Sequence, residues 1–107
     1  GVAYKFTLCK TSLLFLGSIG TQAGTVILEN YKDELACDYL QIPTGKKHLP
    51  DGIYSLANPE TCLWFVTSED WENDAETART RKLITSLGVT DNRVSGLGGI
   101  GTIEIKY

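Results

Sequence analysis

The sequence of 107 residues contains no methionine, only one histidine and only three prolines. Its apolar runs are short, and the longest, residues 13–17, falls far below the roughly 18 residues that suggest a membrane-spanning helix. We therefore expect no membrane span. Because residue 1 is not methionine, we expect a processed N-terminus, from which an initiator Met or a leader was removed or at which the chain was shortened. These absences favour no particular compartment.

An excess of positive charge is also missing. Lys and Arg number 10 against 13 Asp and Glu, which gives a formal net charge of −3 at pH 7. Proteins built to bind nucleic acid present a basic face, so we expect no nucleic-acid partner. A hydrophobic content of 42% is enough to form a folded core, and the length fits one domain spanning residues 1–107.

The three cysteines, Cys9, Cys37 and Cys62, lack the C-x-x-C spacing of zinc and thioredoxin-like sites. A Cys/His metal site would need all three cysteines and the one histidine to converge, so we expect no metal and no cofactor. Each cysteine stands in an apolar stretch. This favours buried free thiols, which act as small hydrophobes, over the two alternatives of one disulfide or a reactive thiol.

Alternating polarity predicts a strand near the N-terminus. Residues 2–9 place Val, Tyr, Phe and Leu on one face, the period-2 pattern of a half-buried strand. A second apolar segment follows at residues 11–17, and the β-branched segment 25–30 predicts another strand. The glycines of residues 18–24 predict a loop or turn between them.

The middle of the chain is more ambiguous. Residues 35–42 fit either a helix or a strand, and we favour the strand, as the return arm of a hairpin around residues 31–34. Residues 53–67 predict a second hairpin that turns at residues 58–60. Its second arm is apolar on both faces, which is typical of a central strand. Residues 101–107 alternate again and predict a final strand.

The convincing helix of the sequence lies between residues 68 and 88. Acidic residues crowd its first turns and basic residues follow, which matches the helix dipole, and Gly88 supplies a C-terminal stop. Its apolar residues form two stripes on nearly opposite sides, so the helix begins late, bends or covers two surfaces. We expect an α+β domain: a mainly antiparallel sheet of five to seven strands, with one long helix, about residues 70–87, packed on one face.

A glycine-rich string near the C-terminus, residues 96–101, spells the G-x-G-x-x-G of dinucleotide-binding loops. That motif functions by opening a helix, and an acidic residue should follow about 20 positions later. Only six residues follow the string, and they predict a strand, so we expect no dinucleotide. We expect Gly98 and Gly99 to act through flexibility or close backbone contact.

The polar loop 44–52 carries the one compact basic cluster outside the helix, Lys46, Lys47 and His48. We take these three residues as candidates for binding a partner or an anion. His48 is also the only histidine available as a catalytic base, but the chain has no G-x-S-x-G motif, and we predict no catalytic residue.

Trp71 stands among five acidic residues at the start of the expected helix. A tryptophan in this setting is either anchored beneath the helix or exposed as an interface anchor. We favour anchoring, and we keep Trp71 among the candidate binding residues.

The balance of these features favours a small non-enzymatic interaction protein, such as an adaptor, an inhibitor or a subunit, that binds another protein or a second copy of itself. Exposed sheet edges and the glycine-bearing loops 17–24 and 95–101 offer docking surfaces. Two alternatives stay open: a small hydrolase-type enzyme that uses His48, and a carrier that holds a small apolar ligand between sheet and helix.

Overall fold

A computed structural model describes residues 3–43 and 48–100, and the expected final strand at 101–107 lies outside this range. In the described part, five strands form one sheet in the order β1-β2-β3-β4-β5. Strands β1 and β2 are antiparallel, and each later strand is parallel to the one before it. The strands are β1 (Tyr4–Leu8), β2 (Thr11–Phe15), β3 (Tyr39–Gln41), β4 (Thr61–Trp64) and β5 (Asp91–Val94).

The sheet is therefore mixed, and the expectation of a mainly antiparallel sheet is wrong. Both expected hairpins of the central region are helical crossovers instead. Residues 21–24, expected in a loop, and the segment 25–30, expected as a strand, together form helix α1 (Thr21–Asn30). The first arm of the second hairpin is helix α2 (Asp51–Ala57). Neighbouring parallel strands cannot be joined by a tight turn, and these helices provide the longer connection that they need.

Helix α1 forms although its sequence is rich in β-branched residues. Ala23, Ile27 and Leu28 lie partly buried against the core, at the spacing of one helical face. Gly24 sits against Leu49 and Pro50, where a Cβ would come within 2.9 Å of both side chains. Burial of this face outweighs the small penalty that β-branched residues carry in a helix.

The single long helix expected at about 70–87 is instead two helices, α3 (Ser68–Asn73) and α4 (Ala75–Ser86). They are separated by Asp74, whose backbone is extended, with φ −76° and ψ 125°. The Asp74 carboxylate accepts hydrogen bonds from the backbone N–H of Thr77 at 2.9 Å and from its hydroxyl at 2.8 Å, which caps α4. The break explains why the apolar residues of this region form two stripes.

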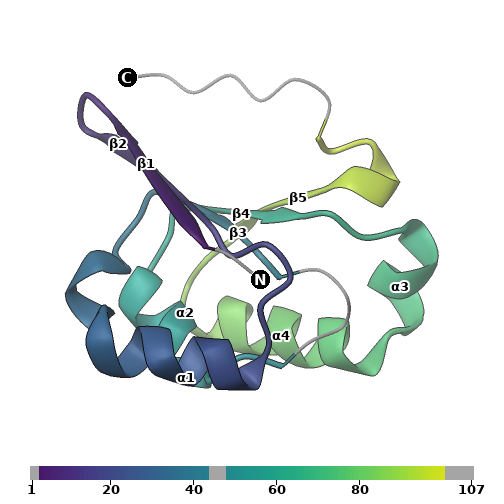
Figure 1. Cartoon of the computed structure of the whole chain (residues 1–107). Coiled ribbons are helices and arrows are strands. Elements are labelled where there is room, and N and C mark those ends of the chain that lie inside the picture. Colours follow the sequence, from purple (N-terminus) through teal and green to yellow (C-terminus); the bar gives the residue numbers. More distant parts are fainter. Residues whose placement is uncertain (1–2, 44–47, 101–107) are drawn as a thin grey trace.

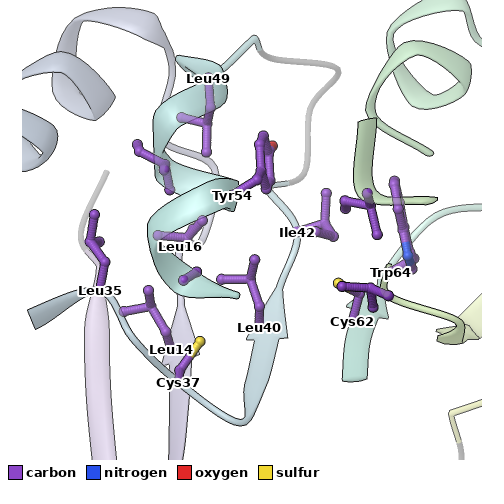
Figure 2. Packing of buried hydrophobic residues seen from close by; sticks show 14 of the residues in the cluster. Leu14, Leu16, Leu35, Cys37, Leu40, Ile42, Leu49, Tyr54, Cys62 and Trp64 are labelled. Atoms are coloured by element: carbon purple, nitrogen blue, oxygen red, sulfur yellow. The ribbon is translucent and has the colours of Figure 1, made fainter. Parts of the chain in front are cut away.

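Helices α1, α2 and α4 lie against the same face of the sheet, which gives two layers (Figure 1). Parallel strands in sequential order produce this arrangement, because crossovers of one hand bring each helix to the same side. The core fills the space between the layers. Leu40 and Cys62 of the sheet and Tyr54 of α2 are each at most 2% exposed (Figure 2).

Strand β4 is buried at all four of its residues, as expected for a central strand. Two side-chain hydrogen bonds fix it to β5: Trp64 Nε1 donates to Asn92 Oδ1 at 2.9 Å, and Thr61 Oγ1 donates to Asp91 Oδ2 at 2.8 Å. Among the described helices, none has the length and apolar character needed to cross a membrane.

The sheet face opposite the helices, called the outer face below, is identified from the strand register. Leu14, Leu40 and Cys62 are register partners on the helix side, so the residues next to them along each strand point outward. Tyr4 pairs with Phe15 and Phe6 with Leu13, which places these side chains on the outer face. Over β3 and β4 the outer-face residues Gln41, Thr61 and Leu63 are buried and Tyr39 is partly buried. Apolar exposure on this face is therefore strongest at β1.

Candidate functional site

Trp71, one of the expected binding residues, is packed in α3 with 9% of its surface exposed. Its ring meets Trp64 edge to face, with centroids 5.2 Å apart, and the Arg81 guanidinium carbon lies over the ring, 3.6 Å from its centroid. Arg81 also donates a hydrogen bond to the Trp71 carbonyl at 3.0 Å. These contacts anchor the ring, and its role in binding stays a prediction.

His48 lies beside a charged cluster on the helix layer. Its Nδ1 atom is 3.0 Å from Glu76 Oε1 and 2.7 Å from an Arg79 guanidinium nitrogen. Arg79 also pairs with Asp51 at 3.1 Å. Helix α4 supplies Glu76 and Arg79 three residues apart, which places both side chains on one face of the helix.

The contacts of the His48 ring limit what it can do chemically. Nδ1 can donate to Glu76 when it carries a proton, or accept from Arg79 when it does not, but it cannot do both at once. Desolvation alone would raise the pKa of the Glu76 carboxyl, but hydrogen bonds from Arg79 and His48 outweigh it and lower that pKa. The cluster is thus built around a stable ion pair, and these contacts give the hydrolase hypothesis no support.

Lys46 and Lys47 lie outside the described residues, so their candidate role stays a prediction.

The glycine loop is described up to Ile100. Gly98 has a φ of 75° and ends the short 3₁₀ turn η2 (Ser95–Leu97). Gly99 donates to the Val94 carbonyl at 2.9 Å, and a Cβ added to it would lie 2.8 Å from the Val94 nitrogen. The backbone of Gly99 therefore lies in close contact with that of Val94. That this loop binds a partner stays a prediction.

The three thiols are free and lie in two environments. Cys37 and Cys62 are buried, and desolvation raises the pKa of each to about 12. Cys9, expected to be buried in a strand, is exposed in the two-residue loop Cys9–Lys10 that joins β1 to β2. Its φ of 55° belongs to a turn position that glycine prefers.

The largest exposed side chains of the N-terminal hairpin gather on the outer face of β1. Tyr4, Phe6 and Leu8 are 57%, 55% and 50% exposed. Phe6 packs edge to face on Phe15 of β2, with centroids 5.8 Å apart, and stacks near Tyr4 at 6.2 Å. We call Tyr4, Phe6, Leu8 and Phe15 the hairpin surface. Other exposed large apolar side chains lie on other parts of the chain: Val26, Tyr31, Leu56, Phe65 and Leu97.

Strand β1 extends beyond the helix layer, since all five of its residues are exposed, including those that face the helix side. The hairpin projects away from the body of the molecule (Figure 1). Beneath it, a groove of about 650 Å³ separates the strands from α1 and from the 3₁₀ turn η1 (Lys32–Glu34). Its lining includes Thr7, Leu14, Ile27, Tyr31 and Leu35.

The hairpin surface was missed in the choice of candidate residues. Alternation along residues 2–9 shows that Tyr4, Phe6 and Leu8 share a face, but it does not show whether that face meets a helix. The partners of His48 were missed for another reason. The i,i+3 spacing of Glu76 and Arg79 is visible in the sequence, whereas the approach of His48, 28 residues before Glu76, depends on the tertiary fold.

Comparison with known proteins finds no matching family model, no similar curated protein and no similar solved structure. Within residues 3–43 and 48–100, no group of three or more His, Cys, Asp or Glu side chains is placed to hold a metal ion.

Proposed function

We propose that this domain is a non-enzymatic protein-interaction module and that the hairpin surface is its binding site. The observation that carries the proposal is the exposure of Tyr4, Phe6 and Leu8, each at least half accessible, on a strand that projects beyond the helix layer. Contiguous exposed apolar side chains mark interaction sites, and aromatic residues are enriched in interfaces.

The backbone of the hairpin supports the same proposal. In the described residues, β1 pairs with β2 alone, so its other edge presents unpaired N–H and C=O groups. Such an edge is a template for another chain. A projecting strand with an apolar face and an unpaired edge offers both contact area and directional hydrogen bonds, which is the basis of recognition by strand addition.

A pull-down from the source organism with matched variants tests the proposal. Phe6→Thr removes the central ring of the hairpin surface but keeps a residue with high strand propensity. We expect this variant to lose most of the protein captured reproducibly by the wild type. The result that counts against the proposal is equal capture by both proteins, or no reproducible capture by either.

Leu56→Gln is the matched control. Leu56 is 43% exposed on α2, so the substitution also removes an exposed apolar side chain, but from the helix layer. Capture by the Leu56→Gln variant should equal that of the wild type. Equal losses in the Phe6 and Leu56 variants would show that the binding depends on general surface hydrophobicity rather than on the hairpin.

A second candidate function, carriage of a small apolar molecule, is favoured by the groove beneath the hairpin. Its volume of about 650 Å³ lies in the range of small-molecule sites. Leu14 and Leu35 form part of its floor and are at most 5% exposed, so the floor belongs to the packed core. The groove lies between sheet and helix, where a carrier would hold its ligand.

Titration with the apolar fluorophore 1-anilinonaphthalene-8-sulfonate separates the two candidates. If the groove carries ligands, Ile27→Trp, which fills one wall of the groove, should reduce probe binding while Phe6→Thr leaves it unchanged. Loss of binding in Phe6→Thr alone would locate the probe on the hairpin surface and remove the carrier hypothesis.

A further inference from the structure

Among residues 3–43 and 48–100, β1 pairs only with β2, and its other edge, called the unpaired edge here, has a definite hydrogen-bonding pattern. Leu8 and Thr11 flank the two-residue loop and face each other in the register. Residues that close such a loop form a hydrogen-bonded pair, and hydrogen-bonded and non-hydrogen-bonded pairs then alternate along the strands. The backbones of Tyr4, Phe6 and Leu8 therefore bond to β2, whereas those of Lys5 and Thr7 face the unpaired edge.

This pattern is self-complementary. If two copies of β1 lie antiparallel with the two-fold axis at Phe6, then Lys5 of each copy faces Thr7 of the other as a hydrogen-bonded pair. Phe6 faces Phe6, and Tyr4 faces Leu8, in the closer non-hydrogen-bonded pairs. Directly opposite residues share a face, so both hairpin surfaces join on the same side of one continuous sheet.

Other registers are less favourable. An axis at Lys5 would place two lysines directly opposite each other, and like charges in that position are destabilising. An axis at Thr7 leaves Tyr4 facing Lys10 instead of an apolar side chain. If the axis passed between two residues, each residue whose backbone faces the unpaired edge would lie opposite a residue whose backbone is already bonded to β2. Such a pair cannot exchange hydrogen bonds between the two copies. Only the Phe6 register pairs all five residues of β1 without opposing like charges.

The one charged residue of β1 is held away from the outer face. Lys5 Nζ donates a hydrogen bond to the Glu34 carbonyl at 2.9 Å, which directs the side chain toward η1 on the helix side. Edge strands are often protected against pairing by lysines and prolines. Here β1 has no proline, and its lysine is bonded back to the same chain, so it does not block the edge.

We infer that the partner of this edge is a second copy of the chain, which pairs antiparallel along β1 with the two-fold axis at Phe6. This inference rests on the proposed function of the hairpin as an interaction surface and names its partner. Because the strand is short, the dimer is of the small, weakly associating class, and its population rises with protein concentration.

Opposite charges introduced at position 6 test the inference. A two-fold axis through Phe6 places this residue directly opposite Phe6 of the second copy. By light scattering, the wild-type mass should rise from that of one chain toward twice that value as concentration increases to about 1 mM, the millimolar range of weak association. Phe6→Lys and Phe6→Glu should each dimerise about tenfold more weakly, since like charges then face each other in place of two rings. An equal mixture of both variants should recover dimers.

Recovery in the mixture distinguishes direct pairing from damage to the fold, which mixing cannot repair. Thr7→Pro gives an independent check: it removes an N–H at the unpaired edge and leaves the bonds to β2 intact, so the variant should stay folded and monomeric. A wild type that is monomeric at every concentration overturns the inference, as does a mixture that forms no dimers. A monomer that still captures another protein through Phe6 would overturn self-pairing alone and leave the proposed function standing.

Discussion

Phe6 and Phe15 meet edge to face on the outer face of the sheet, with ring centroids 5.8 Å apart and ring planes at 85°. The contact crosses the antiparallel pair that begins the sheet, whereas the later strand pairs are parallel. Phe6 remains 55% exposed in this contact. The pair thus holds an aromatic surface in place without covering it, which is what an interaction site requires.

Thiol reactivity should divide the cysteines into two classes. In the native protein, Ellman's reagent should react quickly with the exposed Cys9 alone. Cys37 and Cys62 should react only as the protein unfolds, because burial blocks access and raises their pKa to about 12. In denaturant all three should react at once. Three fast thiols in the native protein would contradict the packing of both buried cysteines.

Asp74→Ala should destabilise the junction between α3 and α4. The variant loses the carboxylate that accepts from the N–H and the hydroxyl of Thr77, and loss of such an N-cap costs about 1 kcal/mol. Urea unfolding followed by circular dichroism measures the change. Glu72→Ala, at an exposed position in α3, is the control and should leave the midpoint nearly unchanged. Equal effects in both variants would contradict the capping role.

The sequence was informative where local pattern decides structure. It identified the first strand, the apolar segment after it and the buried character of β4, because alternation reports the strand period and an apolar run reports burial. The expectation that the first strand is half-buried is wrong, since all five residues of β1 are exposed. Asp74 shows its limit, since an aspartate inside an acidic segment reads as part of a helix start until its bond to Thr77 is seen.

Features that depend on how distant segments pack together were not predictable from local sequence pattern. The β-branched run in α1 is helical because its face is buried against the core, which local propensity does not encode. Parallel or antiparallel pairing depends on the crossover connections, so the mixed sheet could not follow from single strands. For the candidate site, Phe6 is exposed because it lies on the outer face of β1, opposite the helices. Which face of β1 meets the helix layer is a property of the whole fold.

Two glycines of the C-terminal loop should respond differently to substitution. In Gly96→Ala the new Cβ would collide with the backbone of Thr67 and Ser68, which forms the start of α3, and overpacking of this kind costs about 1–3 kcal/mol. In Gly98→Ala the space is open and only the positive φ is penalised, which costs about 1 kcal/mol. Thermal unfolding of both variants checks this order, and a Gly98→Ala variant less stable than Gly96→Ala would contradict it.

The ion-pair cluster around Glu76 should appear in the acid dependence of stability. The folded protein lowers the Glu76 pKa below its ordinary value of 4.5, so its contribution is fully present above that value. It is lost as the pH falls through the lower, folded pKa, because the unfolded chain binds the proton first. Urea midpoints of Glu76→Gln should therefore fall less steeply than those of the wild type in this acid window. Parallel curves would contradict the shift, and Glu72→Gln serves as the exposed control.

Hydrogen exchange by mass spectrometry at low and high protein concentration tests most directly whether the hairpin is the interaction surface. Added protection at high concentration should be confined to the N-terminal hairpin and should be carried by the Lys5 and Thr7 amides. The Phe6 amide, which faces β2, should be protected at both concentrations. Protection that rises in the helix layer instead, or in no part of β1, would show that the hairpin is not the interaction surface.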